Sequence, residues 1–181
     1  IDTYRSGVAR AALDAGAACI NDVSGFSLDP AMCEFAVSAR CPVVVNHMKG
    51  IPKTMQVSPR YDSLWDDLLH FFERRMTRFV NAGGSEEFLV LDPGIGFGKT
   101  PDHNLEILRG IDRLHALGRP IFLGCSRKSF IAGIVDLKSE IRNPKSEIPE
   151  SRLPGSLAAA AWAAIRGVHL LRVHDVAETA Q

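Results

Sequence analysis

Short apolar runs alternate along this chain with longer segments that have helical periodicity. Each apolar run has the length of a buried strand, and each following segment repeats its apolar positions three or four residues apart, which predicts βα units. The predicted strands are Ile1–Thr3, Ala18–Asp22, Pro42–His47, Phe88–Asp92, Ile121–Cys125 and His169–His174. The predicted helices are Ser6–Ala15, Pro30–Ala39, Tyr61–Ala82, Asn104–Leu117, Lys128–Val135 and Gly155–Arg166. The pattern therefore predicts an α/β fold with parallel strands.

Polar residues gather at the carboxyl ends of all six predicted strands. They are Asp2, Asn21, Asp22, Asn46, His47, Asp92, Ser126, Arg127, Lys128, Arg172, His174 and Asp175. In a (β/α)₈ barrel these ends meet and build the active site, whereas an open doubly wound sheet needs polar ends only beside its switch point. Each residue alone also has a structural interpretation: Asn21 and Asp22 could begin a turn, His47 could be a hydrogen-bonded core histidine, and Arg172 could pair with Asp175 or Glu178. The full set favours a TIM barrel.

The chain begins with what looks like the end of a strand, Ile1–Thr3. A closed barrel of roughly 250 residues has eight βα units, so we expect a partial barrel of about six units whose first two are missing. We assign residues 1–181 to one domain. Within it, residues 137–151 contain a short tandem repeat, Lys138–Ile141 and Lys145–Ile148, with little apolar content. We predict a flexible surface insertion there.

The segment Leu89–Thr100 carries Asp92 from an apolar strand straight into a glycine-rich turn. A phosphate-binding P-loop would need a glycine where Pro93 stands, and a dinucleotide fingerprint would need the spacing G-x-G-x-x-G rather than the G-x-G-x-G of Gly94–Gly98. Both nucleotide interpretations are therefore weak. A loop that presents a carboxylate to a ligand remains, with Phe97 either packing the loop or stacking near a planar ligand.

Composition sets limits on the partners. The net charge is +0 over 181 residues, which gives no electrostatic case for nucleic acid or an anionic membrane. No run approaches the roughly 20 apolar residues of a membrane span, and we expect a cytoplasmic protein. The four cysteines have no C-x-x-C pairing and are interpreted as reduced thiols, with Cys125 a bystander rather than a nucleophile.

The polar set suits a ligand that has both a heterocycle and an anionic group. An ionised Asp92 only accepts hydrogen bonds, so it matches a ring edge with two N–H donors, and Asn21 can both donate and accept. Arg172 and His174 offer charge-assisted donors to phosphate oxygens, and Lys128 adds a point charge.

Six segments of the chain resemble, in order, the motifs of the dihydropteroate synthases, a family of pterin-binding enzymes. The resemblance covers nearly the whole chain outside the repeat. The segments are Ile1–Thr3, Ile20–Gly25, His47–Gln56, Asp92–Lys99, Gly124–Ser129 and Arg172–Val176. It implies a barrel that condenses 6-hydroxymethyl-7,8-dihydropterin diphosphate with 4-aminobenzoate, releasing diphosphate on the route to folate.

The resemblance also implies roles for residues of this chain. Asp2, Asp92 and Lys128 would be catalytic, the two carboxylates stabilising positive charge on the pterin as its carbon–oxygen bond breaks. No protein nucleophile is needed. The implied pterin-binding residues are Asp2, Asn21, Met48, Asp92, Gly124 and Lys128; the aminobenzoate would contact Phe97, Ser126 and Lys128, and Arg172 and His174 would bind the diphosphate.

The family's magnesium ligand belongs to the first two βα units, so the resemblance implies Mg²⁺ as a cofactor but no metal ligand within this chain. It also implies a homodimer. A chain that lacks these units would have incomplete diphosphate binding and exposed sheet edges, and we expect it to be inactive alone.

Three alternatives remain. A pterin-binding methyltransferase domain shares the barrel and the strand-end acid, but Ser126–Lys128 and the Arg172/His174 pair argue against it. A noncatalytic pterin-binding module is an alternative of another class. A P-loop NTPase is third, disfavoured by Pro93.

Overall fold

The structure is a computed structural model that describes residues 1–132 and 152–181. The chain divides into two compact units. The first unit contains Ile1–Met48, Tyr61–Gly94 and Leu114–Phe122, and the second contains Lys49–Arg60, Ile95–Arg113 and Leu123–Gln181. The predicted insertion at residues 137–151 lies entirely outside the described residues, as does the end of the helix predicted from Lys128.

The first unit is built on three parallel strands in the order β1-β2-β3. They are β1 (Ile20–Asp22), β2 (Val43–Asn46) and β3 (Leu89–Asp92). Val43 lies opposite both Ile20 and Leu89, and Asn46 lies opposite Asp92. Isolated bridges join Asp2 to Asn21 and Leu91 to Ile121. The α/β prediction is therefore confirmed for this unit, with neighbouring strands parallel.

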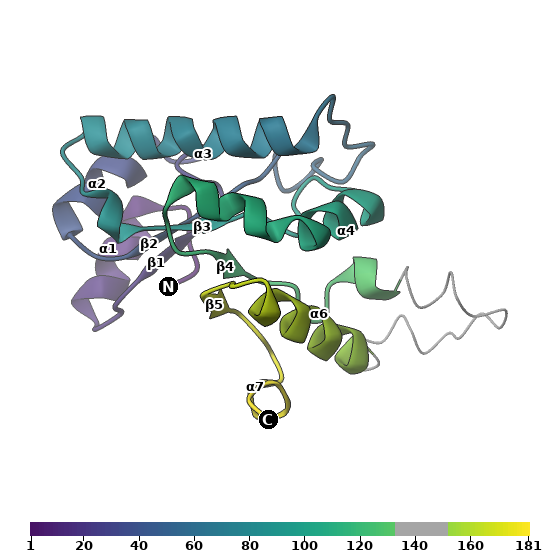
Figure 1. Ribbon diagram of the computed structural model, residues 1–181. Helices are drawn as coiled ribbons and strands as arrows, with labels where there is room; N and C mark the ends of the chain where they lie inside the picture. The colour runs from purple at the N-terminus through teal and green to yellow at the C-terminus, as the bar shows by residue number, and fades with distance from the viewer. Residues whose placement is uncertain (133–151) are drawn as a thin grey trace, which may run out of the picture. The chain divides into compact units, whose positions relative to one another are not determined.

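Helices α1 (Ser6–Asp14), α2 (Met32–Ala39) and α3 (Leu64–Asn81) accompany this sheet, and a 3₁₀ turn, η1 (Glu86–Phe88), leads into β3. In Figure 1 the long helix α3 runs beside the strands. Ser63 caps α3 by accepting a hydrogen bond from the backbone of Asp66. The buried residues of α3 recur at helical spacing, as expected for a helix with one face on a core. They are Leu64, Trp65, Leu68, Phe71, Phe72 and Phe79.

The second unit contains α4 (Pro101–Arg109), β5 (Leu170–Leu171), α6 (Leu153–Ile165) and α7 (Val176–Thr179). Thr100 and His103 form a capping box at the start of α4, with Pro101 in its first turn. The indole N–H of Trp162 in α6 donates to the carbonyl of Leu108 in α4 at 2.7 Å. Two further elements, η2 (Ile111–Leu117) and β4 (Phe122–Leu123), cross from one unit to the other along the chain. β4 and β5 form a two-stranded sheet.

Two predictions about elements were wrong. The helix expected over Asn104–Leu117 is instead α4 followed by η2, because Thr100 and Pro101 start the helix earlier and Gly110 ends it. The strand expected at Ile1–Thr3 is only a bridge at Asp2, so the described residues contain five strands. The predicted count of six βα units is not confirmed.

Candidate functional site

One face of the β1-β2-β3 sheet ends in polar side chains. Alternate residues of a strand point to opposite faces, and residues opposite one another in register share a face. Asn21 of β1 lies opposite Val44 of β2. Asn46 lies two residues after Val44 in β2, so it shares that face, and it is opposite Asp92 of β3. Asn21, Asn46 and Asp92 therefore lie on one face. The other face carries fully buried apolar side chains, namely Ile20, Val43, Val45, Leu89 and Leu91.

Asp92 is 6% exposed at the end of β3. Its Oδ1 accepts a hydrogen bond from the Gly94 backbone at 2.8 Å, and its carbonyl accepts one from the His47 backbone at 2.9 Å. Gly94 has φ +70°, and a Cβ there would lie 1.9 Å from the carbonyl oxygen of His47. The turn after Asp92 is therefore packed backbone to backbone, which holds the carboxylate in place.

Two asparagine side chains lie on the same face as this carboxylate, Asn46 on the neighbouring strand and Asn21 on the strand beyond it. The Nδ2 of Asn21 donates to Oδ1 of Asp2 at 3.1 Å, and Nδ2 of Asn46 donates to the Val23 carbonyl at 2.7 Å. The Oδ1 atoms of both asparagines are buried and have no hydrogen-bond partner within the described part of the chain. Buried polar atoms normally have partners, so these two oxygens indicate a place for a ligand's N–H groups or for water.

The sequence pattern marked Asn46 only as a polar residue at a strand end, without a binding role. The structure places it opposite Asp92 and so adds it to the candidates for binding. Met48 is half-buried and lies two residues beyond the end of β2, and Asp2 is exposed.

Two other polar residues of these strand ends have structural roles. Asp22 accepts hydrogen bonds from the backbone and hydroxyl of Ser24, at 2.9 and 2.7 Å, and from the backbone of Phe26 at 2.7 Å. The turn interpretation of Asp22 is therefore confirmed. His47 is 5% exposed and meets the Phe71 ring edge-on, with 4.8 Å between ring centroids.

The second unit brings Lys128 and Phe97 together. The Lys128 ammonium lies 4.4 Å from the centre of the Phe97 ring and donates to the carbonyl of Ile95 at 2.9 Å. The loop itself is held from both sides: the Gly96 backbone donates to Oδ1 of buried Asn104 at 2.9 Å, and Lys99 donates to the Phe97 carbonyl at 3.1 Å. A cation over an aromatic ring at this distance is an attractive contact, so it stabilises the relative positions of the Lys128 ammonium and the Phe97 ring.

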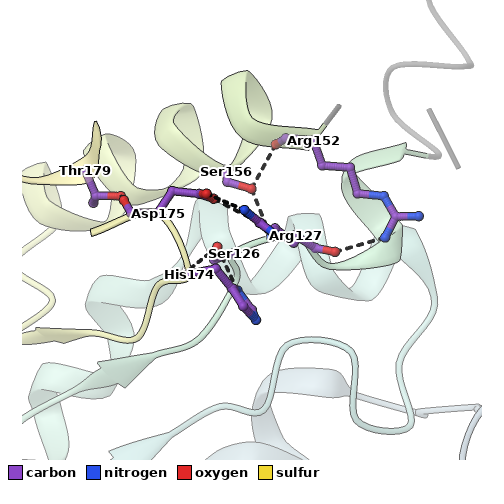
Figure 2. A network of polar contacts seen from close by, with 7 residues as sticks. All are labelled: Ser126, Arg127, Arg152, Ser156, His174, Asp175 and Thr179. Carbon is purple, nitrogen blue, oxygen red and sulfur yellow. Dashed lines mark hydrogen bonds and ion pairs between the residues drawn. The ribbon is translucent and has the colours of Figure 1, made fainter. Parts of the chain in front are cut away.

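The same unit brings together the segments that follow β4 and β5. The Ser126 hydroxyl accepts from the His174 backbone at 3.2 Å and lies 3.1 Å from its Nδ1. Arg127 forms an ion pair with Asp175, through Nε at 3.1 Å and also through Nη2 (Figure 2). Arg172 and His174 are exposed and follow β5, and Gly124 follows β4. The structural interpretation, in which Arg172 could pair with Asp175 or Glu178, did not foresee that Asp175 pairs with Arg127.

This ion pair makes the stability of the protein depend on pH. The Arg127 guanidinium lowers the pKa of Asp175 below its ordinary 3.8. A carboxyl whose folded-state pKa is lowered stabilises the fold above the unfolded-state pKa and loses that contribution as the pH falls through the folded-state value. We expect Asp175→Asn to lower the urea midpoint at pH 7, and this difference to shrink below pH 3.8. A difference that is unchanged at pH 2.5, measured by circular dichroism, would contradict the pairing.

All four cysteines are free thiols, as predicted. Burial raises the pKa of the Cys19, Cys33 and Cys41 thiols. Within residues 1–132 and 152–181, no group of three or more histidine, cysteine, aspartate or glutamate side chains is placed to hold a metal ion. None of the helices described is long and apolar enough to cross a membrane.

Comparisons with known proteins point in one direction. The family model described as pterin binding enzyme matches residues 1–174. The chain is 39% identical to dihydropteroate synthase from Escherichia coli K12 over 181 residues, which is all of this chain and 60% of that protein. It is 38% identical to dihydropteroate synthase from a Synechocystis species, again covering 60% of that protein.

Solved structures agree. The crystal structure of Yersinia pestis dihydropteroate synthase with a sulfonamide drug matches with a TM-score of 0.90 and 39% identity, covering 99% of this chain and 61% of that one. Dihydropteroate synthase from Xanthomonas albilineans in complex with 7,8-dihydropteroate matches with a TM-score of 0.86 and 38% identity, covering 99% and 62%. The chain thus spans about 60% of the length of its curated relatives. Because the family model matches almost every residue, the chain belongs to the family of pterin binding enzymes.

Proposed function

We propose that the intact protein is a dihydropteroate synthase. It condenses 6-hydroxymethyl-7,8-dihydropterin diphosphate with 4-aminobenzoate, giving 7,8-dihydropteroate and diphosphate for folate biosynthesis. The observation that carries this proposal is the polar face of Asn21, Asn46 and Asp92, which combines a buried carboxylate with two buried amide oxygens that have no partner in the described part of the chain. The relatives named dihydropteroate synthase support it.

In this proposal residues of the first unit bind the pterin ring. Asp92 accepts from the 2-amino group and a ring N–H, because a carboxylate offers two acceptor oxygens in one plane. Asn21 binds the same ring, and Met48 packs on its face. Asp2 and Asp92 stabilise the positive charge that develops as the carbon–oxygen bond to the diphosphate breaks.

In this proposal the residues that bind the diphosphate and the aminobenzoate belong to the second unit, as do Gly124 and Lys128 of the pterin-binding set. Arg172 and His174 donate to the diphosphate and neutralise the leaving group. Phe97, Ser126 and Lys128 bind the aminobenzoate, and Gly124 lets the pterin ring approach the backbone. The amine of the aminobenzoate is the nucleophile, so catalysis consists of orientation and charge stabilisation.

Further properties of the intact protein are proposed from the family resemblance. The fold is a (β/α)₈ barrel of which this chain supplies about six units. That the chain supplies only part of the barrel agrees with its covering 60% of its relatives. The protein is a cytoplasmic homodimer. Magnesium is the expected cofactor, but the described residues offer no cluster that fits it, and the mechanism above uses only side chains of this chain.

The test is an assay of the intact protein with the pterin diphosphate and 4-aminobenzoate, following both dihydropteroate by chromatography and released diphosphate. We expect both products in equal amounts. Pterin binding without turnover would favour a noncatalytic module, and methyl transfer from a folate to a corrinoid would favour a methyltransferase. Either result would overturn the proposal.

Lys128→Ala tests the aminobenzoate subsite. The substitution removes the cation from the Phe97 ring and a donor from the Ile95 carbonyl. A loss of about 1–3 kcal/mol corresponds to a roughly 5- to 150-fold fall in kcat/KM for aminobenzoate. Lys53→Ala, at an exposed position of the same unit, is the matched control and should change nothing. Equal kinetics for the two variants would remove Lys128 from the site.

A further inference from the structure

A bidentate ion pair joins the two segments that the proposed function assigns to different substrate groups. Arg127 follows β4 and Asp175 follows β5. Nε of Arg127 donates to one carboxylate oxygen of Asp175 and Nη2 donates to the other, as Figure 2 shows. Their side chains are only 27% and 12% exposed. Bidentate pairing fixes orientation as well as distance, so these segments are fixed relative to each other within the second unit.

The backbone of Arg127 is held as firmly as its side chain. Its φ of +57° lies in the left-handed region, which costs a residue with a Cβ roughly 1–2 kcal/mol. Two residues at the start of α6 maintain this strained conformation. The Ser156 hydroxyl accepts a hydrogen bond from the Arg127 N–H at 2.9 Å, and Arg152, which caps the helix, donates to the Arg127 carbonyl at 2.9 Å. Strained backbone that surrounding contacts maintain is concentrated at functional sites.

The residues beside this pair are the candidates for substrate contact. Ser126 and Lys128 flank Arg127 in the sequence, and His174 directly precedes Asp175. The Ser126 hydroxyl also contacts the backbone and ring of His174. A shift of Arg127 would therefore move the groups proposed for aminobenzoate together with one proposed for diphosphate.

We propose that Arg127 and Asp175 are positioning residues of the synthase reaction, an inference that rests on the proposed function. Their ion pair keeps Ser126 and Lys128 aligned with His174, without either member contacting a substrate. Small displacements of reacting groups can lower rates by about 100-fold, so breaking the pair should affect both substrates together.

The test compares Asp175→Asn and Arg127→Gln with wild type in the intact protein. We expect kcat/KM for each substrate to fall roughly 10- to 100-fold, and the double variant to be no worse than either single one, because the members act as a unit. The affinity for inorganic diphosphate, measured by calorimetry, should fall in parallel. The matched control is Asp112→Asn, which breaks the more exposed, singly bonded pair with Arg166 at 3.3 Å and should leave kcat/KM unchanged.

Melting temperatures separate positioning from simple destabilisation. Asp175→Asn should lower the melting temperature more than Asp112→Asn, because its ion pair is less exposed. At temperatures well below both melting transitions, only Asp175→Asn should change the kinetics. If Asp175→Asn does not fold, Arg127→Lys carries the test, because it keeps the charge and loses the fork. If wild type is active and the folded variants have the same kinetics as wild type, this inference is overturned and the proposed function stands. Inactive wild type would overturn the proposed function and this inference with it.

Discussion

Gly94→Ala is expected to destabilise the protein by roughly 2–5 kcal/mol, combining left-handed strain with a steric clash. Gly94 has φ +70°, and an added Cβ would lie 1.9 Å from the His47 carbonyl oxygen. The backbone of residue 94 fixes the position of the Cβ, and the atom it meets is itself a backbone oxygen, so the clash cannot be relieved by rotating a side chain. Relief requires the turn after β3 to separate from the end of β2, which also displaces the Asp92 carboxylate that bonds to the Gly94 N–H.

Gly118→Ala is the matched control. Gly118 has a similar φ of +66° in the same unit, but a Cβ there meets nothing within 4 Å. It should cost about 1–2 kcal/mol through strain alone. Urea unfolding of both variants measures the difference, which is the contribution of the clash. Equal midpoints would mean that the Gly94 turn is not packed against His47.

The α/β character and the start and end of most elements follow from local sequence patterns. Strands β1, β2 and β3 lie within the predicted strands, and β2 and β3 are buried and apolar up to their last residues, which makes them easy to recognise. One failure depends on pairing between distant segments, and the other on local helix start and stop signals that were overlooked. The Ile1–Thr3 strand is reduced to one bridge, and the helix predicted from Asn104 is divided at Gly110.

Some residues of the candidate site can be found from local sequence patterns, whereas others depend on contacts between distant segments. Asp92 and Lys128 could be found because motifs and strand ends mark them. Asn46 needed the register of β2 with β3, which places it opposite Asp92, and register depends on pairing between distant segments. The pairing of Arg127 with Asp175 joins residues 48 positions apart, and no local pattern predicts such a contact.

The largest functional effect is expected for Asp92→Asn. The amide keeps an oxygen for the Gly94 N–H, so the turn should survive, but the other position then presents an N–H₂ donor to the proposed ring donors. Losing charge-assisted hydrogen bonds costs about 3 kcal/mol, so the dissociation constant of a 6-substituted pterin should rise roughly 100-fold. Calorimetric titration of the intact protein measures this change, with the unfolding midpoint recorded alongside.

Asp22→Asn separates a structural carboxylate from a binding one. Asp22 ends another strand of the same sheet, β1, but it lies opposite Val45, on the buried apolar face. Its oxygens accept hydrogen bonds from Ser24 and Phe26. Replacing one oxygen by an amide leaves a buried N–H without its acceptor and costs about 1–3 kcal/mol of stability. The folded variant should nevertheless bind pterin as wild type does. If both aspartate variants weakened pterin binding equally, the face on which a carboxylate lies would not determine whether it binds pterin. The assignment of Asp92 as the pterin-binding carboxylate would then be wrong.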